Sequence, residues 1–259
     1  MSDTFYVPLS DGRWRATEHT VGPWDAAFQH AGPPSALLGR DIMRAAPRDD
    51  MVIARFSCEI LGPVPVGELE LRTRVVRPGR SVELLESVAH AGGRDVAVAR
   101  AWRVLRTDSV SVPASLPAPP AVPDEGVWRV PEGWVDGYLS AIDWRSVTGQ
   151  FGEPGPATMW SRMRYPLVPA EEPGPLERVL IVADSGNGLS NELDIAKWQF
   201  INPELTVHLH REAVGEWILI DATTTISAGG AGLATTVLSD HHGPIGQGAQ
   251  SLLISPHRR

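Results

Sequence analysis

The second half of the sequence contains a carboxylate, a hydroxyl and a carboxamide on segments with the composition of β-strands. These residues are Glu204, Thr225 and Gln250. A carboxylate can take a proton from water, and a hydroxyl and an amide can hold that water in place, so the set suits hydrolysis. Taken singly, each residue is more often an ordinary surface or strand residue. Whether the three residues form a site is judged from a comparison with the first half of the chain.

The chain reads as two copies of one unit. Val66-Gly67-Glu68 opens a strand in the first half, and Val214-Gly215-Glu216 opens one in the second. Trp14 and Trp160 stand ahead of the two copies in a similar way. At the positions of Glu204, Thr225 and Gln250, the first copy has Phe56, Arg77 and Arg100. We therefore interpret the polar set as a site that only the second copy carries.

Each copy is expected to contain one helix followed by a meander of antiparallel strands, which is an α+β layout. Pro34 suits a first helical turn, and apolar residues then recur at helical spacing through position 45. Strands are predicted at 11–18, 51–61, 68–75, 81–90 and 96–105. The second copy should have a strand at 158–164 and a helix beginning near 183–190. Its later strands are predicted at 197–210, 216–226, 232–238 and 246–255.

A proline-rich stretch at 109–131 separates the copies and favours an extended linker. The sequence thus predicts an N-terminal unit at 1–108, a linker region at 109–150 and a C-terminal unit at 151–259.

Composition excludes several classes of protein. The net charge of -8 argues against nucleic acid as the main partner. No apolar stretch approaches the roughly 20 residues that a membrane span requires, and the polar N-terminus does not resemble a secretory signal. Cys58 is the only cysteine, which excludes an intrachain disulfide and suits a reducing cytoplasm. No G-x-S-x-G motif occurs, which argues against an α/β-hydrolase.

The order and spacing of several short motifs resemble the acyl-CoA thioesterase II type of double-hotdog proteins, from about Trp14 to Ser255. The motifs are His30-Ala31-Gly32-Pro33-Pro34, Ala183-Asp184-Ser185-Gly186-Asn187-Gly188, Asn202-Pro203-Glu204-Leu205-Thr206 and Ala249-Gln250-Ser251. The resemblance implies two hotdog units whose sheets join side by side around two central helices. The acyl chain then lies between sheet and helix. An Asp, a Thr or Ser, and a Gln hold the water that attacks the thioester.

Carried onto this sequence, the resemblance places Glu204 at the carboxylate position, Thr225 at the hydroxyl position and Gln250 at the amide position. Glu204 departs from the family's Asp by one methylene, and Thr223 or Thr224 is the alternative if the register differs. The expected reaction converts acyl-CoA and water into a free fatty acid and CoA. No metal or organic cofactor is implied, and whole chains are expected to pair as a homodimer or larger assembly.

The oxyanion donor is expected to be a backbone N–H at the N-terminus of a buried helix. Gly32, Gly186 and Gly188 would let the substrate approach that backbone. Asp184 is expected either to cap the helix or to line the substrate pocket. The arginines at the strand ends, Arg72, Arg74, Arg77 and Arg80, would either contact CoA phosphates or form a solvated face.

Two other functions remain open. A hotdog hydratase or dehydratase would need a histidine beside a carboxylate, and His30 is the candidate. A non-catalytic acyl-thioester or lipid-binding protein would result if Glu204 had disabled hydrolysis. His208 and His210 share a strand face at a spacing that could bind metal, but without a third ligand we interpret them as ordinary strand residues.

Overall fold

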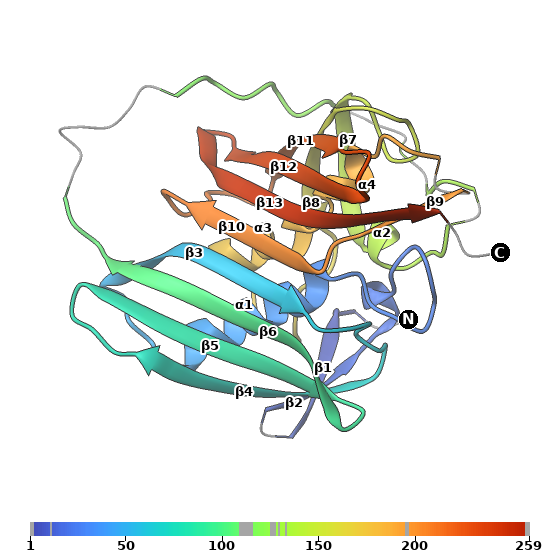
Figure 1. The fold of residues 1–259 in the computed structure, drawn as a ribbon. Coiled ribbons are helices and arrows are strands. Elements are labelled where there is room, and N and C mark those ends of the chain that lie inside the picture. The colour runs from blue at the N-terminus through green and yellow to red at the C-terminus, as the bar shows by residue number, and fades with distance from the viewer. Residues whose placement is uncertain are drawn as a thin grey trace.

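The computed structural model describes residues 3–10, 12–108, 116–124, 128, 130–132, 134–194 and 197–256. The strands in these ranges form one antiparallel sheet of 13 strands. Figure 1 shows this sheet as a broad curved layer, with the helices α1 and α3 behind it.

The strand order confirms the internal repeat. The strands of the first half are β1 (Tyr6–Ser10), β2 (Arg13–Ala16), β3 (Met51–Ile60), β4 (Glu68–Arg77), β5 (Val82–Ala91) and β6 (Arg94–Leu105). Those of the second are β7 (Ile142–Thr148), β8 (Ala157–Met163), β9 (Trp198–Ile201), β10 (Glu204–Leu209), β11 (Ile218–Ile226), β12 (Ala231–Asp240) and β13 (Gly243–Pro256). The order β1-β2-β4-β5-β6-β3 continues as β10-β13-β12-β11-β8-β7, and β9 pairs with β13. Each half therefore has the same arrangement in mirror order, and the halves join where β3 pairs with β10.

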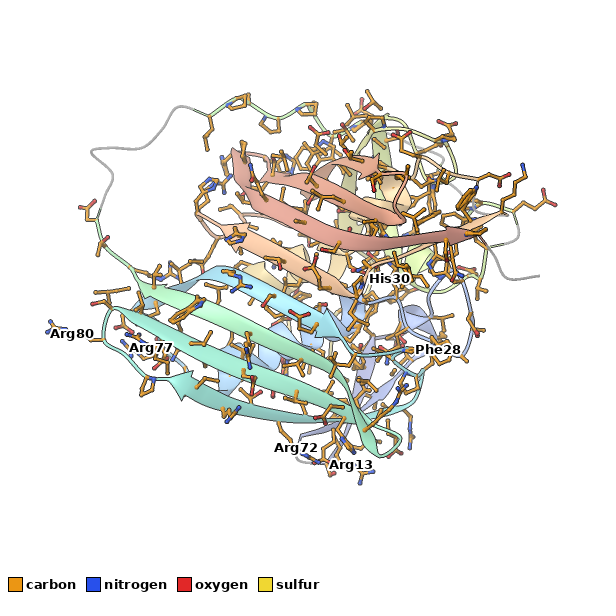
Figure 2. All side chains as sticks on the ribbon, viewed as in Figure 1. Arg13, Phe28, His30, Arg72, Arg77 and Arg80 are labelled. Carbon is orange, nitrogen blue, oxygen red and sulfur yellow. The ribbon has the colours of Figure 1, made fainter. Side chains whose placement is uncertain are left out.

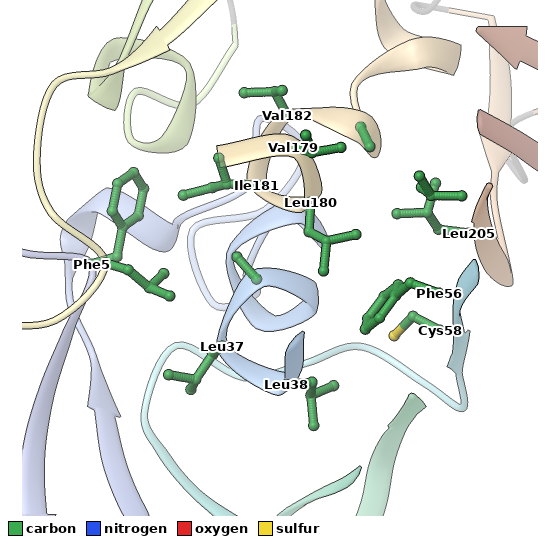
Figure 3. Close-up of a cluster of buried hydrophobic side chains, with 14 of the residues drawn as sticks. Phe5, Leu37, Leu38, Phe56, Cys58, Val179, Leu180, Ile181, Val182 and Leu205 are labelled. Carbon is green, nitrogen blue, oxygen red and sulfur yellow. The ribbon is translucent and has the colours of Figure 1, made fainter. Parts of the chain in front are cut away.

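Two helices fill the inner face of the sheet. They are α1 (Gly32–Ala45) and α3 (Pro175–Ala183), with the short η1 (Glu18–Thr20), α2 (Tyr138–Ala141) and α4 (Gly186–Leu189) nearby. Figure 3 shows Leu38 and Leu180 facing Phe56 and Leu205 across the space between helices and sheet. All four of these side chains are fully buried. Removal of this apolar surface from water is the main force that holds helices and sheet together.

The structure corrects the prediction for the second helix. The main helix is α3, which begins at Pro175 and ends at Ala183, and only the short α4 begins within the predicted stretch 183–190. Its last residues, Val179 to Ala183, are all buried. α3 has only nine residues and carries polar side chains only in its first turn, so it offers too few helical turns for a clear apolar periodicity.

The predicted strand at 197–210 is also corrected, because it breaks into β9 and β10 at Asn202-Pro203. Proline has no N–H for the strand ladder. Ile201 pairs with Leu253 and Thr206 with Ala249, so this segment has one more residue than β13 between the two pairs. An extra residue of this kind is a β-bulge, which redirects the neighbouring side chains.

The predicted linker region contains part of the C-terminal unit. β7 lies within 109–150 and pairs with β8, so this unit begins no later than residue 142. Residues 109–115 of the linker lie outside the described residues, and 116–124 form neither helix nor strand. In the described part of the chain, none of the helices has the length and apolar character needed to cross a membrane.

Candidate active site

Gln250 lies on the inner face of β13 and is 1% exposed. Its Nε2 donates to the backbone oxygen of Asp184 at 2.9 Å and to Oδ1 of the same residue at 3.1 Å. Its Oε1 accepts a hydrogen bond of 3.0 Å from the backbone N–H of Asn187. These three bonds fix the orientation of the amide, which directs its N–H groups at the backbone oxygen and the carboxylate of Asp184.

Asp184 follows the last residue of α3 and is almost completely buried. Its Oδ1 also accepts a 2.7 Å hydrogen bond from Nδ2 of Asn202, and the backbone N–H of Ala31 is a further donor to the carboxylate. Burial raises the pKa of Asp184 to about 7, although the hydrogen bonds from Asn202 and Gln250 oppose the rise. A carboxylate with a pKa near neutrality is well suited to act as a general base.

His30 completes the buried network at the start of α1. Its Nδ1 accepts a 3.1 Å hydrogen bond from the N–H of Gly32 and lies 3.6 Å from Oδ2 of Asp184. The imidazole stacks on Tyr138 with ring centroids 3.8 Å apart, and the Tyr138 hydroxyl donates to the backbone oxygen of Ile181 at 2.9 Å. Burial lowers the pKa of His30 to about 3. The ring is therefore neutral, and because Nδ1 accepts, its proton is on Nε2.

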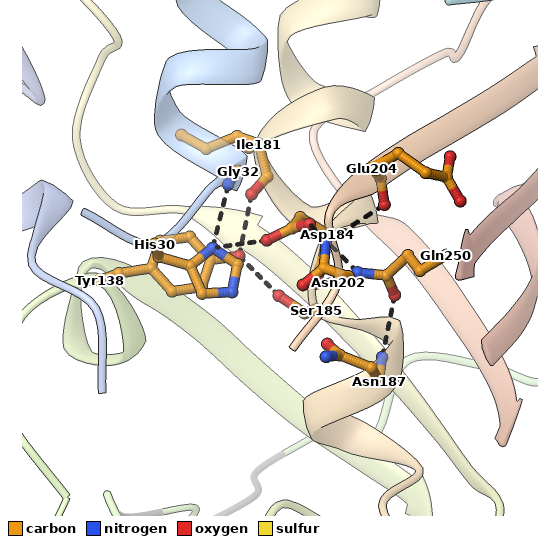
Figure 4. A network of polar contacts seen from close by, with 10 residues as sticks. All are labelled: His30, Gly32, Tyr138, Ile181, Asp184, Ser185, Asn187, Asn202, Glu204 and Gln250. Carbon is orange, nitrogen blue, oxygen red and sulfur yellow. Dashed lines mark hydrogen bonds and ion pairs between the residues drawn. The ribbon is translucent and has the colours of Figure 1, made fainter. Parts of the chain in front are cut away.

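Figure 4 shows how separate elements converge on Asp184: His30 from the start of α1, Asn202 from the break between β9 and β10, and Gln250 from β13. The bulge at Asn202-Pro203 turns the Asn202 side chain toward the helices. Beside Asn202 opens a mostly apolar cavity of about 500 Å³. The site thus combines a buried carboxylate with two amides and lies next to space for a ligand.

Glu204 lies on the other face of the sheet. Its Oε2 accepts a hydrogen bond of 3.0 Å from the Thr206 hydroxyl, and its Oε1 accepts one of 2.7 Å from the Ser251 N–H. Figure 4 shows the Glu204 carboxylate pointing away from Asp184. Because adjacent strand residues face opposite sides, Ser251 faces outward where Gln250 faces inward. The structure does not bring the carboxylate of Glu204 to Gln250.

Thr225 is exposed on β11 and is likewise not brought to Gln250. Its neighbour Thr224 faces inward, is 6% exposed and shares a 2.8 Å hydrogen bond with Ser190. Of the three threonines considered from the sequence, only Thr224 points toward the helices.

Two of the three glycines expected to admit substrate are packed tightly against the protein itself. A Cβ on Gly32 would lie 2.0 Å from the backbone oxygen of Ile181, so this glycine lets α1 approach α3. A Cβ on Gly186 would lie 2.9 Å from Oε1 of Gln250, whereas one on Gly188 would make only ordinary contact at 3.7 Å with Phe151. Gly32 and Gly186 therefore position the network.

The start of α1 offers few donors for an oxyanion. The N–H of Ala31 is directed to Asp184 and that of Gly32 to His30, while Pro33 and Pro34 have none. The side-chain amide of Asn202 is a donor that both borders the cavity and contacts Asp184.

Three of the four arginines at the strand ends form contacts within the N-terminal half. Arg72 pairs with Glu70, Arg74 with Glu86, and Arg77 lies over the ring of Trp102. Figure 2 shows Arg72, Arg77 and Arg80 well separated from His30. Within the described residues, no three His, Cys, Asp or Glu side chains are grouped closely enough to hold a metal ion.

Asn202 was included in a sequence motif but was given no role, and Asp184 was treated as a cap or pocket residue. The Asn202-Pro203 pair was the available signal, because a proline within a strand pattern indicates a break or bulge. The alignment of the two copies was also inaccurate. Phe56, which is aligned with Glu204, is fully buried, and Arg100, which is aligned with the buried Gln250, is exposed. The aligned residues therefore do not all occupy equivalent environments.

Comparisons with known proteins agree with this architecture. The profile described as "Acyl-CoA thioesterase C-terminal domain" matches residues 113–254, and that described as "Acyl-CoA thioesterase N-terminal domain" matches residues 20–104. No curated protein sequence matches the chain.

Several solved structures have the same fold. A putative thioesterase from Novosphingobium aromaticivorans is 21% identical with a TM-score of 0.73, over 96% of this chain and 98% of that one. A hot dog fold protein of unknown function from Alicyclobacillus acidocaldarius is 14% identical with a TM-score of 0.75, over 99% and 98%. An acyl-CoA thioesterase II from Mycobacterium marinum is 16% identical with a TM-score of 0.67, over 97% and 95%.

The fold predicted from the sequence, a double hotdog of α+β class, is thus confirmed. With both of its halves matched, the chain belongs to the acyl-CoA thioesterase family and is a thioester hydrolase.

Proposed function

We propose that this protein hydrolyses acyl-CoA to a free fatty acid and CoA, with Asp184 as the general base. The observation that carries the proposal is the direction of the two side-chain amides. Gln250 and Asn202 both donate to the same buried carboxylate, 3.1 Å and 2.7 Å from its Oδ1. Their hydrogen bonds hold the carboxylate in place, and Asn202 also borders the cavity.

The set fits the carboxylate, hydroxyl and amide pattern implied by the family resemblance, with one replacement. In this proposal Asp184 takes the role of the family's aspartate from a position other than that of Glu204, Gln250 keeps the role of the glutamine, and Asn202 takes the role of the threonine or serine. The carboxylate can accept a proton from water, and an amide, like a hydroxyl, can both donate and accept hydrogen bonds to that water. Asp184 thus replaces Glu204 as the proposed base.

The reaction then follows from the chemistry of these groups. The oxygen of a water molecule attacks the thioester carbonyl carbon while Asp184 takes one of its protons. The oxyanion that forms is stabilised by the N–H of Asn202, whose other contact is a long 3.3 Å bond to the Glu204 backbone oxygen. The C–S bond breaks, and the CoA thiolate takes the proton from Asp184, which restores the carboxylate.

The position of His30 keeps the hydratase hypothesis open to test, since its Nδ1 lies near Asp184. That nitrogen already accepts from Gly32, which favours a positioning role over proton transfer. The two functions separate when thiol release from a saturated acyl-CoA and loss of enoyl absorbance from an enoyl-CoA are measured on the same preparation. Thiol release alone supports the proposal, and hydration without thiol release contradicts it.

We also propose that the chain acts in the cytoplasm and that whole chains pair in solution. The lone buried Cys58 suits a reducing compartment. The sheet ends in the strands β1 and β7, and exposed strand edges are commonly covered by assembly. Light scattering during size-exclusion chromatography measures the mass, and a monomer would contradict the pairing.

A further inference from the structure

The cavity beside Asn202 is formed by loops and the end of the sheet. Its walls come from the segment 22–29 before α1, the turn after β3, and β9. Figure 2 shows Phe28 and His30 on the same side of the molecule. The principal apolar lining residues are Trp24, Phe28, Ile60, Trp198, Phe200 and Ile201.

The layer between sheet and helices, where the resemblance implies that the acyl chain lies, is closely packed. Leu38, Phe56 and Leu205 leave no exposed surface there. The cavity bordered by Met43, Ile53 and Leu176 of this layer holds only about 130 Å³. Ligand sites commonly measure roughly 300–1,000 Å³. The cavity at Asn202, at about 500 Å³, falls within that range.

The lining of the cavity favours an apolar ligand. Asp25 is its sole charged side chain, and the Asp25 carboxylate accepts a 2.8 Å hydrogen bond from the N–H of Ala27. None of the described residues that line the cavity is a cation, and Asp25 would repel a phosphate or a second carboxylate. Trp24 is 56% exposed and Phe28 is 37% exposed, so apolar surface remains available to a ligand.

Asn202 lies between this cavity and the proposed base. It borders the cavity and donates to Asp184 at 2.7 Å. A thioester carbonyl placed beside Asn202 would have its acyl tail against the aromatic walls.

We infer that this cavity holds the acyl group of the substrate, and that the protein takes apolar acyl groups of several carbons in preference to acetyl or dicarboxylic ones. The inference rests on the proposed function for the position of the thioester. Burial of one methylene contributes about a fourfold gain in affinity. The affinity for acyl-CoAs should therefore rise about fourfold per added methylene until the cavity is filled.

The test uses the Asp184→Asn variant as the parent, so that binding is measured without turnover. Calorimetric dissociation constants are compared for acetyl-, butyryl-, hexanoyl- and octanoyl-CoA, and for glutaryl-CoA. We expect the affinity to rise roughly fourfold per methylene, and we expect glutaryl-CoA to bind no better than acetyl-CoA. Adding Trp24→Ala or Phe28→Ala should flatten the dependence on chain length. Adding Trp102→Ala, on β6 and outside the cavity, should leave it unchanged.

Ile201→Asp provides a second variant that removes no aromatic ring. Ile201 is 52% exposed, so the substitution places a carboxylate in the lining with little effect on folding. It should also abolish the chain-length gain. An undiminished gain in both Phe28→Ala and Ile201→Asp would overturn the inference, as would equal affinity for all chain lengths in the parent. If the affinity rises with chain length and both variants diminish that rise, but the wild type releases no thiol, the cavity is supported and the hydrolytic mechanism is refuted.

Discussion

Nδ1 of His30 lies 3.6 Å from Oδ2 of Asp184, and burial shifts the pKa values of the two residues in opposite directions. The pKa of Asp184 rises to about 7, and that of His30 falls to about 3. Between these two pKa values the folded protein therefore carries one proton on Asp184 and none on His30. The unfolded chain has the reverse arrangement, because its His titrates near 6.5 and its Asp near 3.9.

This relationship predicts opposite pH dependences for two variants. Between about pH 4 and 6.5, the two groups of the wild type bind the same number of protons folded and unfolded. In His30→Gln only the raised pKa of Asp184 remains, so the free energy of unfolding should rise as pH falls. In Asp184→Asn only the lowered pKa of His30 remains, so the free energy of unfolding should fall as pH falls. Each slope, relative to the wild type, should be about 1.4 kcal/mol per pH unit.

Urea unfolding at several pH values across this range measures these slopes. Thr225→Ala, at an exposed position, serves as a control that should follow the wild type. Parallel curves for His30→Gln and Asp184→Asn would show that the two groups do not titrate as a buried pair.

The activity should depend on pH through the same carboxylate. Asp184 must be ionised to accept a proton from water, so kcat/KM should fall about tenfold per unit as pH drops below about 7. Glu204→Gln should shift this midpoint slightly downward, because the charge of Glu204 raises the pKa of Asp184. Thiol release at saturating and limiting substrate provides the profile. A midpoint near the ordinary pKa of a carboxyl group would contradict the assignment of Asp184.

Asn202 should be replaceable by a hydroxyl but not by a methyl group. Asn202→Ala removes the 2.7 Å donor to Asp184 and the proposed oxyanion donor, and should lower kcat by about 10²–10³. Asn202→Thr supplies the residue type that the family pattern has, and should retain more of the activity than Asn202→Ala. Steady-state kinetics on one acyl-CoA decides this. Equal activity of the two variants would show that no polar group is needed at this position.

Close packing should make Gly32 sensitive to substitution. Gly32→Ala forces a Cβ to within 2.0 Å of the Ile181 backbone oxygen, and the helices must separate to relieve the clash. We expect a loss of at least about 1–3 kcal/mol of stability. Gly188→Ala is the matched control, because its Cβ would meet only an ordinary contact. Thermal unfolding measures both, and a Gly32→Ala variant as stable as Gly188→Ala would contradict the packing argument.

The sequence predicted the sheet well because its signals are local. The alternation of apolar and polar residues identified β4, and β12 and β13 form separate strands as the predicted strands at 232–238 and 246–255 required. The helix α1 was predicted from its prolines and apolar spacing.

The site was less predictable because its partners are distant in the chain. Asp184 acquires its role from Ala31, Asn202 and Gln250, which tertiary packing alone brings together. Aligning the two copies also failed at Gln250. The residue aligned with it, Arg100, is exposed, and in a strand a shift of one residue reverses the face.

The central claim is that the carboxylate of Asp184, and not that of Glu204, activates the water. Thiol release should be measured for the wild type, Asp184→Asn and Glu204→Gln on an acyl-CoA that the wild type hydrolyses, with circular dichroism to confirm folding. We predict that Asp184→Asn lowers kcat by about 10²–10⁴, while Glu204→Gln stays within a few-fold of the wild type. Near-normal turnover by Asp184→Asn, together with loss of activity in Glu204→Gln, would contradict this account and return the catalytic role to Glu204.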